Sequence, residues 1–167
     1  MKAIIFVCLL ATTVLASATE LPWAKPLEVH YLAFAKAVAS DLRAGDRKMT
    51  KSRMAYQALM ALENEPYMNH AGRHAFYAGI SQKINGQYKE LMMNLYRYLK
   101  GLPSHMTVAE RNAWYLKNMA LNEDFMYHSK EVVKHLQEDN IKLCRYHTDQ
   151  CVQHFMKLVV QWLDVTE

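Results

Sequence analysis

Apolar residues recur every three or four positions along most of this chain, which is the spacing of one face of an α-helix. The set near the start of the chain is Leu27, Tyr31, Phe34, Val38 and Leu42. The set near its end is Val152, Phe155, Met156, Val159 and Leu163. We expect each set to be the buried face of a helix, and the chain to be an all-α, single-domain bundle of about six helices.

Glycine and proline residues divide this pattern into separate helices. Gly45 follows the first helix, and Pro66 ends the second, because the residue before a proline avoids helical angles. A long third helix is expected over residues 67–100. Its apolar stripe is Ile84, Tyr88, Leu91, Leu95 and Leu99. The pair Asn85-Gly86 lies inside this helix and is a candidate for a break or kink.

The next helix has a recognisable start. Thr107 and Glu110 have the spacing of a capping box, in which each side chain accepts a hydrogen bond from the backbone amide of the other residue. The residues expected on one face of this helix are Val108, the stem of Arg111, Tyr115 and Met119. Asn122 is a candidate restart of the helix, and Asp139-Asn140 is a weak break further along.

The first residues have the pattern of a secretory signal peptide. Lys2 precedes an uncharged run from Ala3 to Leu15, and the small residues at 16–18 form a cleavage site. A transmembrane anchor is the alternative, but a span needs about 20 apolar residues. We therefore expect residues 1–18 to be removed and residues 19–167 to form one secreted, extracellular, helical domain with no membrane span.

An oxidising compartment changes the interpretation of the cysteines. Cys8 leaves with the signal peptide, and Cys144 and Cys151 remain as a pair. On one straight helix these two residues would lie about 10.5 Å apart along the axis, whereas a disulfide needs Cα atoms within about 7 Å. Thr148 is a good capping residue and allows a new helix to begin between them. We therefore expect a Cys144–Cys151 disulfide at a corner between two helices.

Two groups of side chains could instead bind a metal ion. One has the spacing C-x2-H-x3-C-x2-H and consists of Cys144, His147, Cys151 and His154. A zinc site there would require the corner to wrap around the ion, and the thiols of an exported protein oxidise first. The other is the pair His70 and His74, but the metalloprotease pattern H-E-x-x-H requires glutamate where this chain has Ala71. We expect no metal and no cofactor.

The composition favours helices and limits the function. The 167 residues include 11 Met and 10 Tyr but only 5 Gly and 4 Pro. The 20 Lys and Arg exceed the 16 Asp and Glu only slightly, which is too mild an excess to indicate a nucleic-acid partner. The sequence contains no nucleophile elbow, P-loop or dinucleotide-binding motif. We therefore expect a protein that is not an enzyme and has no catalytic residue.

Two stretches are candidates for contacting a partner protein. The first is a basic cluster of Arg47, Lys48, Lys51 and Arg53, which could make an electrostatic contact with an acidic protein or a glycosaminoglycan. Its alternative interpretation is a solvated loop between helices. The second is the run Tyr96, Arg97 and Tyr98, whose alternative is an ordinary amphipathic helix. Tyrosine and arginine are the residue types that often anchor protein interfaces, so we expect both stretches to be exposed.

Three segments carry a family resemblance: ELPWAKPLEVHYLAFAKAVASDLRAG near the expected mature start, ERNAWYLKNMALNEDF in the middle and LCRYHTDQC near the end. With its signal peptide and single helical domain, the chain resembles the anophensin/albicin group of salivary proteins of blood-feeding mosquitoes. The resemblance implies a non-enzymatic salivary inhibitor that binds host plasma proteins. The targets it implies are the alternative-pathway convertase of complement or the contact activation of the kallikrein–kinin system.

Two other functions remain open from the sequence. Methionine and aromatic side chains can line a pocket between helices, so the protein could be a secreted carrier of an apolar small ligand. It could also be a structural protein or a protein of reproductive fluid. In each case we expect a monomer.

Overall fold

The structure, a computed structural model, describes residues 21–99 and 105–166, apart from the side chains of Tyr98, Leu99 and Thr166. In this part of the chain there are five α-helices, one short 3₁₀ turn and no strand. The elements are α2 (Ala24–Ala44), α3 (Thr50–Ala61), η1 (Leu62–Asn64), α4 (His70–Leu99), α5 (Val108–Gln137) and α6 (Ile141–Thr166). The all-α prediction is confirmed, but the number of helices is five and not about six. The predicted signal peptide, residues 1–18, lies outside the described residues.

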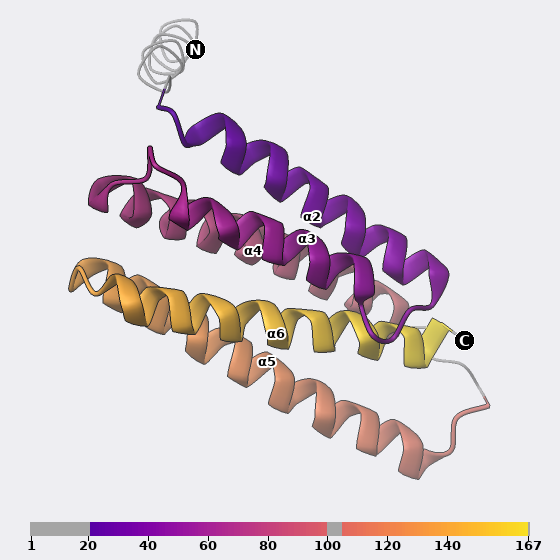
Figure 1. Cartoon of the computed structure of the whole chain (residues 1–167). Helices are drawn as coiled ribbons and strands as arrows, with labels where there is room; N and C mark the ends of the chain where they lie inside the picture. The colour runs from indigo at the N-terminus through magenta and orange to yellow at the C-terminus, as the bar shows by residue number, and fades with distance from the viewer. Residues whose placement is uncertain (1–20, 100–104, 167) are drawn as a thin grey trace, which may run out of the picture.

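Consecutive helices run in opposite directions and pack as two hairpins joined by α4 (Figure 1). The closest pairings are α2 with α3 and α5 with α6, and α4 packs against both α5 and α6. The end of α6 lies beside the turn between α2 and α3, where Arg47 forms an ion pair with Asp164. In the described residues, no helix is long and apolar enough to span a membrane.

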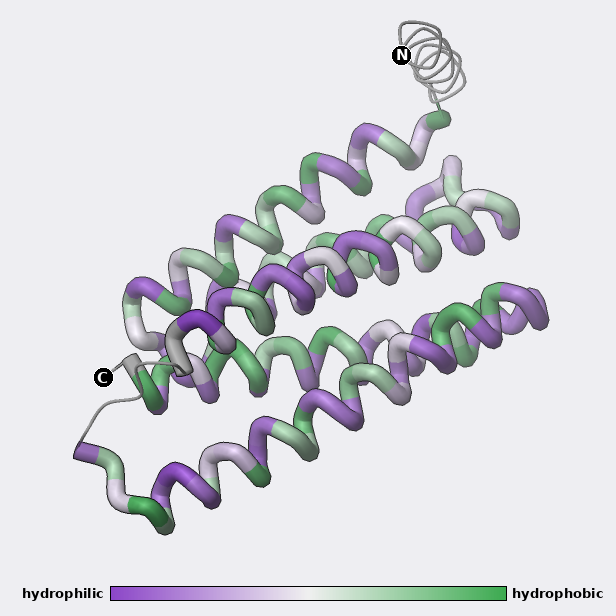
Figure 2. The backbone as a smooth tube through the Cα atoms, turned by 180° about the vertical axis from the view of Figure 1, so that it is seen from behind, coloured by the Kyte–Doolittle hydropathy of each residue, from purple (hydrophilic) through white to green (hydrophobic). Residues whose placement is uncertain are grey.

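The apolar stripes of α2 and α6 form the centre of the core, as the sequence pattern predicted. Phe34 on α2 is 0% exposed, and Val152 and Phe155 on α6 are 0% and 2% exposed. Hydrophobic and hydrophilic residues alternate along every helix (Figure 2), so each helix has apolar side chains to bury against its neighbours. Burying one such side chain stabilises the fold by about 1.5–3 kcal/mol relative to leaving it exposed.

The buried face of α5 differs from the predicted one. Val108 is 75% exposed and Met119 is 57% exposed, whereas Trp114, Leu121 and Phe125 are buried. Three residues of the predicted set, Val108, Tyr115 and Met119, are exposed to solvent. Apolar residues lie all around the first half of α5, so their spacing alone does not indicate which face meets the bundle.

Two predicted helix breaks are absent. α4 continues through Asn85-Gly86, and α5 continues through Asn122. The Asn122 side chain donates a hydrogen bond to the Asn118 carbonyl one turn earlier, at 2.7 Å, so its polar group is satisfied inside the helix. Asparagine and glycine lower the stability of a helix without necessarily ending it.

Two other boundaries are confirmed. The capping box of α5 is present, with Glu110 N donating to Thr107 Oγ1 at 3.2 Å and Thr107 N donating to Glu110 Oε2 at 2.7 Å. The turn between α5 and α6 falls at Asp139-Asn140, where Asp139 has a positive φ of 56°. The Asn140 side chain then accepts from the Leu143 amide at the start of α6.

The predicted disulfide is wrong. Cys144 and Cys151 both lie on α6, which is one continuous helix, and both are free and buried. No new helix begins at Thr148, which is 2% exposed inside α6. Two turns of helix separate the thiols by about 10.5 Å along the axis, which exceeds disulfide geometry. Instead, each thiol faces a backbone carbonyl of α5, Cys144 that of Val132 and Cys151 that of Phe125.

Candidate interaction groove

An apolar groove runs along the surface between α4 and α5. It has a volume of about 640 Å³. Its lining residues are Tyr88, Met92, Met93, Leu95, Tyr96 and Arg97 from α4, and Met119, Asn122, Glu123 and Met126 from α5. We call this feature the α4–α5 groove. It lies where the unburied side of α5, with its exposed methionines, meets the second half of α4.

Four methionines dominate the walls of the groove. Met93, Met119 and Met126 are 57%, 57% and 47% exposed, which is high for apolar side chains of this size. Methionine is unbranched and polarisable, so it adapts its shape to different apolar partners. A contiguous exposed patch of this kind is typical of a binding surface.

The floor of the groove is held by contacts between α4 and α5. The Tyr88 ring stacks on Phe125, with ring centroids 4.2 Å apart. The Tyr88 hydroxyl donates to Asn122 Oδ1 at 2.6 Å, which joins α4 to α5. Burial raises the pKa of Tyr88, so its hydroxyl keeps the proton that this hydrogen bond needs. The groove therefore combines an ordered base with adaptable walls.

One of the two predicted contact stretches lies at this groove. Tyr96 is 67% exposed, and both Tyr96 and Arg97 line the groove at the end of α4. Tyr98 belongs to the same turn of α4, but its side chain lies outside the described residues. The structure thus places an aromatic ring and a guanidinium beside an apolar depression, an arrangement common among interface anchors.

The predicted basic cluster spans the turn between α2 and α3, with Arg47 and Lys48, and the start of α3, with Lys51 and Arg53. All four of its side chains are exposed. Arg47 pairs with Asp164, and Arg53 donates to Gln153 Oε1 at 3.0 Å, so both reach across to α6. Lys51 donates to Ser40 Oγ at 3.0 Å. These contacts fasten the turn to the rest of the bundle, and they give this cluster a structural role.

The two predicted stretches do not form one surface. Arg47 and Arg53 line a separate depression of about 330 Å³, together with Lys117 and Lys157. None of the residues that line this depression also lines the α4–α5 groove. The basic cluster and the Tyr96–Arg97 stretch therefore belong to different candidate surfaces.

The histidine pair near the start of α4 has two separate partners. His70 Nε2 lies 2.8 Å from the Asp139 carboxylate, and His74 Nε2 donates to the Leu136 carbonyl at 2.8 Å. The first contact joins α4 to the turn between α5 and α6, and the second joins α4 to the last turn of α5. His70 and His74 have the i,i+4 spacing of a shared metal site, but in this structure each makes a separate contact.

A row of four imidazoles lies along the seam between α5 and α6. His154 stacks on His128 at 5.5 Å between ring centroids, His128 meets His147 at 5.2 Å, and His147 stacks on His135 at 5.3 Å. These residues lie seven apart on each helix, at positions 128 and 135 and at 147 and 154. Sequence reasoning grouped the last two with the cysteines, because their partners on α5 are distant in the chain.

Comparisons with protein-family models, with curated proteins and with solved structures give no match. The class of this protein is therefore defined by its own geometry. It is an all-α bundle with an adaptable apolar groove and a histidine-lined helical seam.

Proposed function

We propose that the chain is a non-enzymatic binding protein that docks a partner protein in the α4–α5 groove. The observation that carries this proposal is the exposure of three methionines beside Tyr96 and Arg97. Apolar side chains left in water favour association with an apolar partner surface. Tyr96 and Arg97 at the rim supply the aromatic and cationic anchors that carry much of the energy of many interfaces.

The partner that we propose is a host plasma protein. The support for it is the resemblance of the chain to secreted salivary inhibitors of complement and of contact activation. An inhibitor of this kind needs no catalytic residues. It acts by covering a surface that the plasma cascade needs, and a standard interface covers about 800 Å² on each partner. The groove would form the centre of such a footprint.

The experiment measures two plasma activities with the purified chain from Thr19 to Glu167. One assay follows lysis of erythrocytes by the alternative pathway of complement, and the other follows kallikrein release during contact activation. We expect dose-dependent inhibition of one of them at micromolar protein or below. A chain denatured by heat serves as the control. Full activity of both cascades at the highest dose would reject the plasma target.

A carrier of an apolar small ligand is the second candidate, because the volume of about 640 Å³ is typical of small-molecule sites. Such sites bury about 70–90% of the ligand, whereas the methionine walls of this groove are themselves about half exposed. That openness favours docking of a protein surface. Native mass spectrometry distinguishes the two, since a carrier binds fatty acids or apolar dyes stoichiometrically and a docking surface does not.

A further inference from the structure

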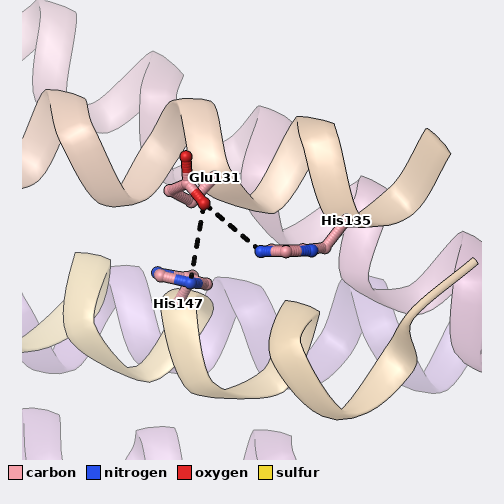
Figure 3. A group of neighbouring side chains, drawn as sticks. All are labelled: Glu131, His135 and His147. Atoms are coloured by element: carbon pink, nitrogen blue, oxygen red, sulfur yellow. Dashed lines mark ion pairs between the residues drawn. The ribbon is translucent and has the colours of Figure 1, made fainter. Parts of the chain in front are cut away.

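Three potential metal ligands converge between α5 and α6. Figure 3 shows the Glu131 carboxylate facing ring nitrogens of His135, one turn along α5, and of His147 on α6. One ligand atom of each residue lies within 4.8 Å of the others. Both histidines are 7% exposed, and Glu131 is half-buried. The group is thus shielded on the histidine side and open to solvent at the carboxylate.

We propose that Glu131, His135 and His147 form a binding site for a divalent transition-metal ion of the Zn²⁺ type. Imidazole nitrogen and carboxylate oxygen are donors that Zn²⁺ prefers in proteins. Three protein ligands leave one tetrahedral position for water or for an external ligand. The site differs from the two arrangements that the sequence suggested, because it takes its ligands from the facing sides of two helices and uses neither cysteine.

One donor distance matches this geometry, and a second is about half an ångström longer. His135 Nε2 lies 3.3 Å from Glu131 Oε2, and His147 Nε2 lies 4.0 Å from the same oxygen. Donors at the usual Zn²⁺ bond lengths lie about 3.3–3.5 Å apart in a tetrahedral site. The two imidazole planes are within 13° of each other. To aim its nitrogen at the shared point, the His147 ring would turn about its Cβ–Cγ bond, which is a soft torsion.

Both histidines have a second partner at the other ring nitrogen. His135 Nδ1 lies 2.9 Å from Glu138 Oε2, and His147 Nδ1 lies 2.9 Å from His128 Nδ1. A neutral imidazole that binds a metal through Nε2 carries its proton on Nδ1 and needs an acceptor there. Glu138 supplies a carboxylate acceptor, and His128 supplies a nitrogen lone pair. Such outer partners are typical of metal-binding histidines, because they fix the tautomer and the orientation of the ring.

One cation competes with a metal for the same carboxylate. The Lys134 ammonium lies 3.9 Å from Glu131 Oε2.

Metal binding would join α5 to α6 near the Asp139-Asn140 turn. His135 and Glu131 belong to one helix and His147 to the other, so the ion would bridge the hairpin. A ligand that binds only the folded state stabilises that state. The metal should therefore raise the unfolding temperature and slow amide exchange around this turn.

The test uses the chain from Thr19 without a histidine tag, after removal of metals with a chelator. Zn²⁺ is titrated against a chromophoric chelator, and Co²⁺ is followed by its visible absorption, which is intense in a tetrahedral site. We expect one equivalent of metal per chain and a rise of about 3 °C or more in Tm at saturation. Failure of the wild-type chain to bind either metal at micromolar concentration would overturn the proposal.

Three variants locate the site. His147→Gln and Glu131→Gln each remove a ligand and should weaken binding by about 100-fold or more, while Glu138→Gln should weaken it by about 10-fold. His154→Gln is the matched control, one heptad further along α6, and should bind within about threefold of wild type. Circular dichroism shows whether each variant is folded. If His147→Gln does not fold, Glu131→Gln tests the loss of a ligand in its place. Binding that survives loss of Glu131, or that falls equally with His154→Gln, would contradict this site.

Discussion

Asp41 illustrates how a single side chain joins two helices in this bundle. Its carboxylate is 1% exposed at the end of α2. It accepts hydrogen bonds from the Ser52 amide and the Ser52 hydroxyl, both at 2.7 Å, in the first turn of α3. A buried carboxylate at a helix N-terminus satisfies amide donors that have no partner within the helix.

Replacing Asp41 with alanine should lower the free energy of unfolding by about 2–3 kcal/mol, because Ser52 would keep two buried donors without an acceptor. Ser40→Ala is the matched control. It removes an exposed contact from Lys51 at the same turn and should change stability by less than about 0.5 kcal/mol. Urea denaturation measures both. Equal stability of Asp41→Ala and wild type would contradict this assignment.

At the scale of one helix, α4 tolerates a glycine that the sequence suggested as a break. Gly86 is exposed, and an added Cβ would meet nothing within 4 Å. The backbone of Gly86 is already helical. Compared with alanine, glycine at this position therefore only makes the unfolded chain more flexible.

Gly86→Ala should therefore raise the free energy of unfolding by about 0.5–1 kcal/mol. Gly79→Ala on the same helix is the control, because its Cβ would lie 3.1 Å from Leu27 Cδ2 and would press on the core. We expect the control to gain less or to lose stability. Thermal unfolding followed by circular dichroism separates the two, and a destabilised Gly86→Ala would indicate that α4 is not continuous there.

Helix α6 holds two free, buried cysteines, Cys144 and Cys151. Burial raises the pKa of the Cys144 thiol to about 11 and that of the Cys151 thiol to about 12. The reactive thiolate is therefore scarce at neutral pH. In the chain from Thr19, both thiols should resist iodoacetamide in the native state and react fully in urea.

A reducing agent should leave the Tm of this chain unchanged. Breaking a native disulfide typically costs about 2–5 kcal/mol, which would lower Tm clearly. Scanning calorimetry with and without reductant measures the difference. A fall of Tm on reduction, or a mass lower by two hydrogen atoms under oxidising conditions, would show that the disulfide forms and would require a break in α6.

The capping box of α5 predicts a pH dependence. Hydrogen bonds from the Thr107 amide and then its side chain lower the pKa of Glu110. Because the folded pKa is lower, the unfolded chain binds more protons in the window between the two values, and stability rises with pH there. The contribution of Glu110 is therefore present above its ordinary value of about 4.3 and is lost as the pH falls through the folded pKa.

Glu110→Gln should have a lower Tm than wild type between pH 5 and about 8, and the difference should vanish in acid. Titration of other groups affects both proteins alike, so the difference between the two curves isolates Glu110. A difference that grows on acidification would contradict the sign of this shift.

The sequence was sufficient for helices whose apolar residues lie on one side and whose ends have strong local signals. The stripes of α2 and α6 and the Thr107–Glu110 box are of this kind, because helical spacing and capping are local properties. The sequence was insufficient for α5, whose apolar residues serve both the core and the α4–α5 groove.

The group of Glu131, His135 and His147 was also missed, since it forms only when α6 folds back on α5. The Glu131–His135 spacing was the one local signal for it.

At the scale of the whole molecule, no helix among residues 21–99 and 105–166 covers the side of α5 that carries Met119 and Met126. α6 covers Leu121 and Phe125, and the second half of α4 meets α5 only partly, so Met93, Met119 and Met126 stay exposed. In the proposed function, this unburied face is the part of the molecule that binds the partner. The opposite side of the same helix contributes Leu121, Phe125 and Val132 to the core.

Tyr96→Ala tests the proposed role of the groove most directly, in the complement and contact-activation assays. Loss of an anchor worth about 2 kcal/mol should raise the concentration needed for half-inhibition by about 30-fold. Tyr127→Ala on α5 is the control, because Tyr127 is 56% exposed, similar to the 67% of Tyr96, and does not line the groove. We predict a large loss of inhibition for Tyr96→Ala and wild-type inhibition for Tyr127→Ala, with equal Tm values. Equal potency of the two variants, or no inhibition by the wild-type chain, would contradict the claim that the groove binds a plasma protein.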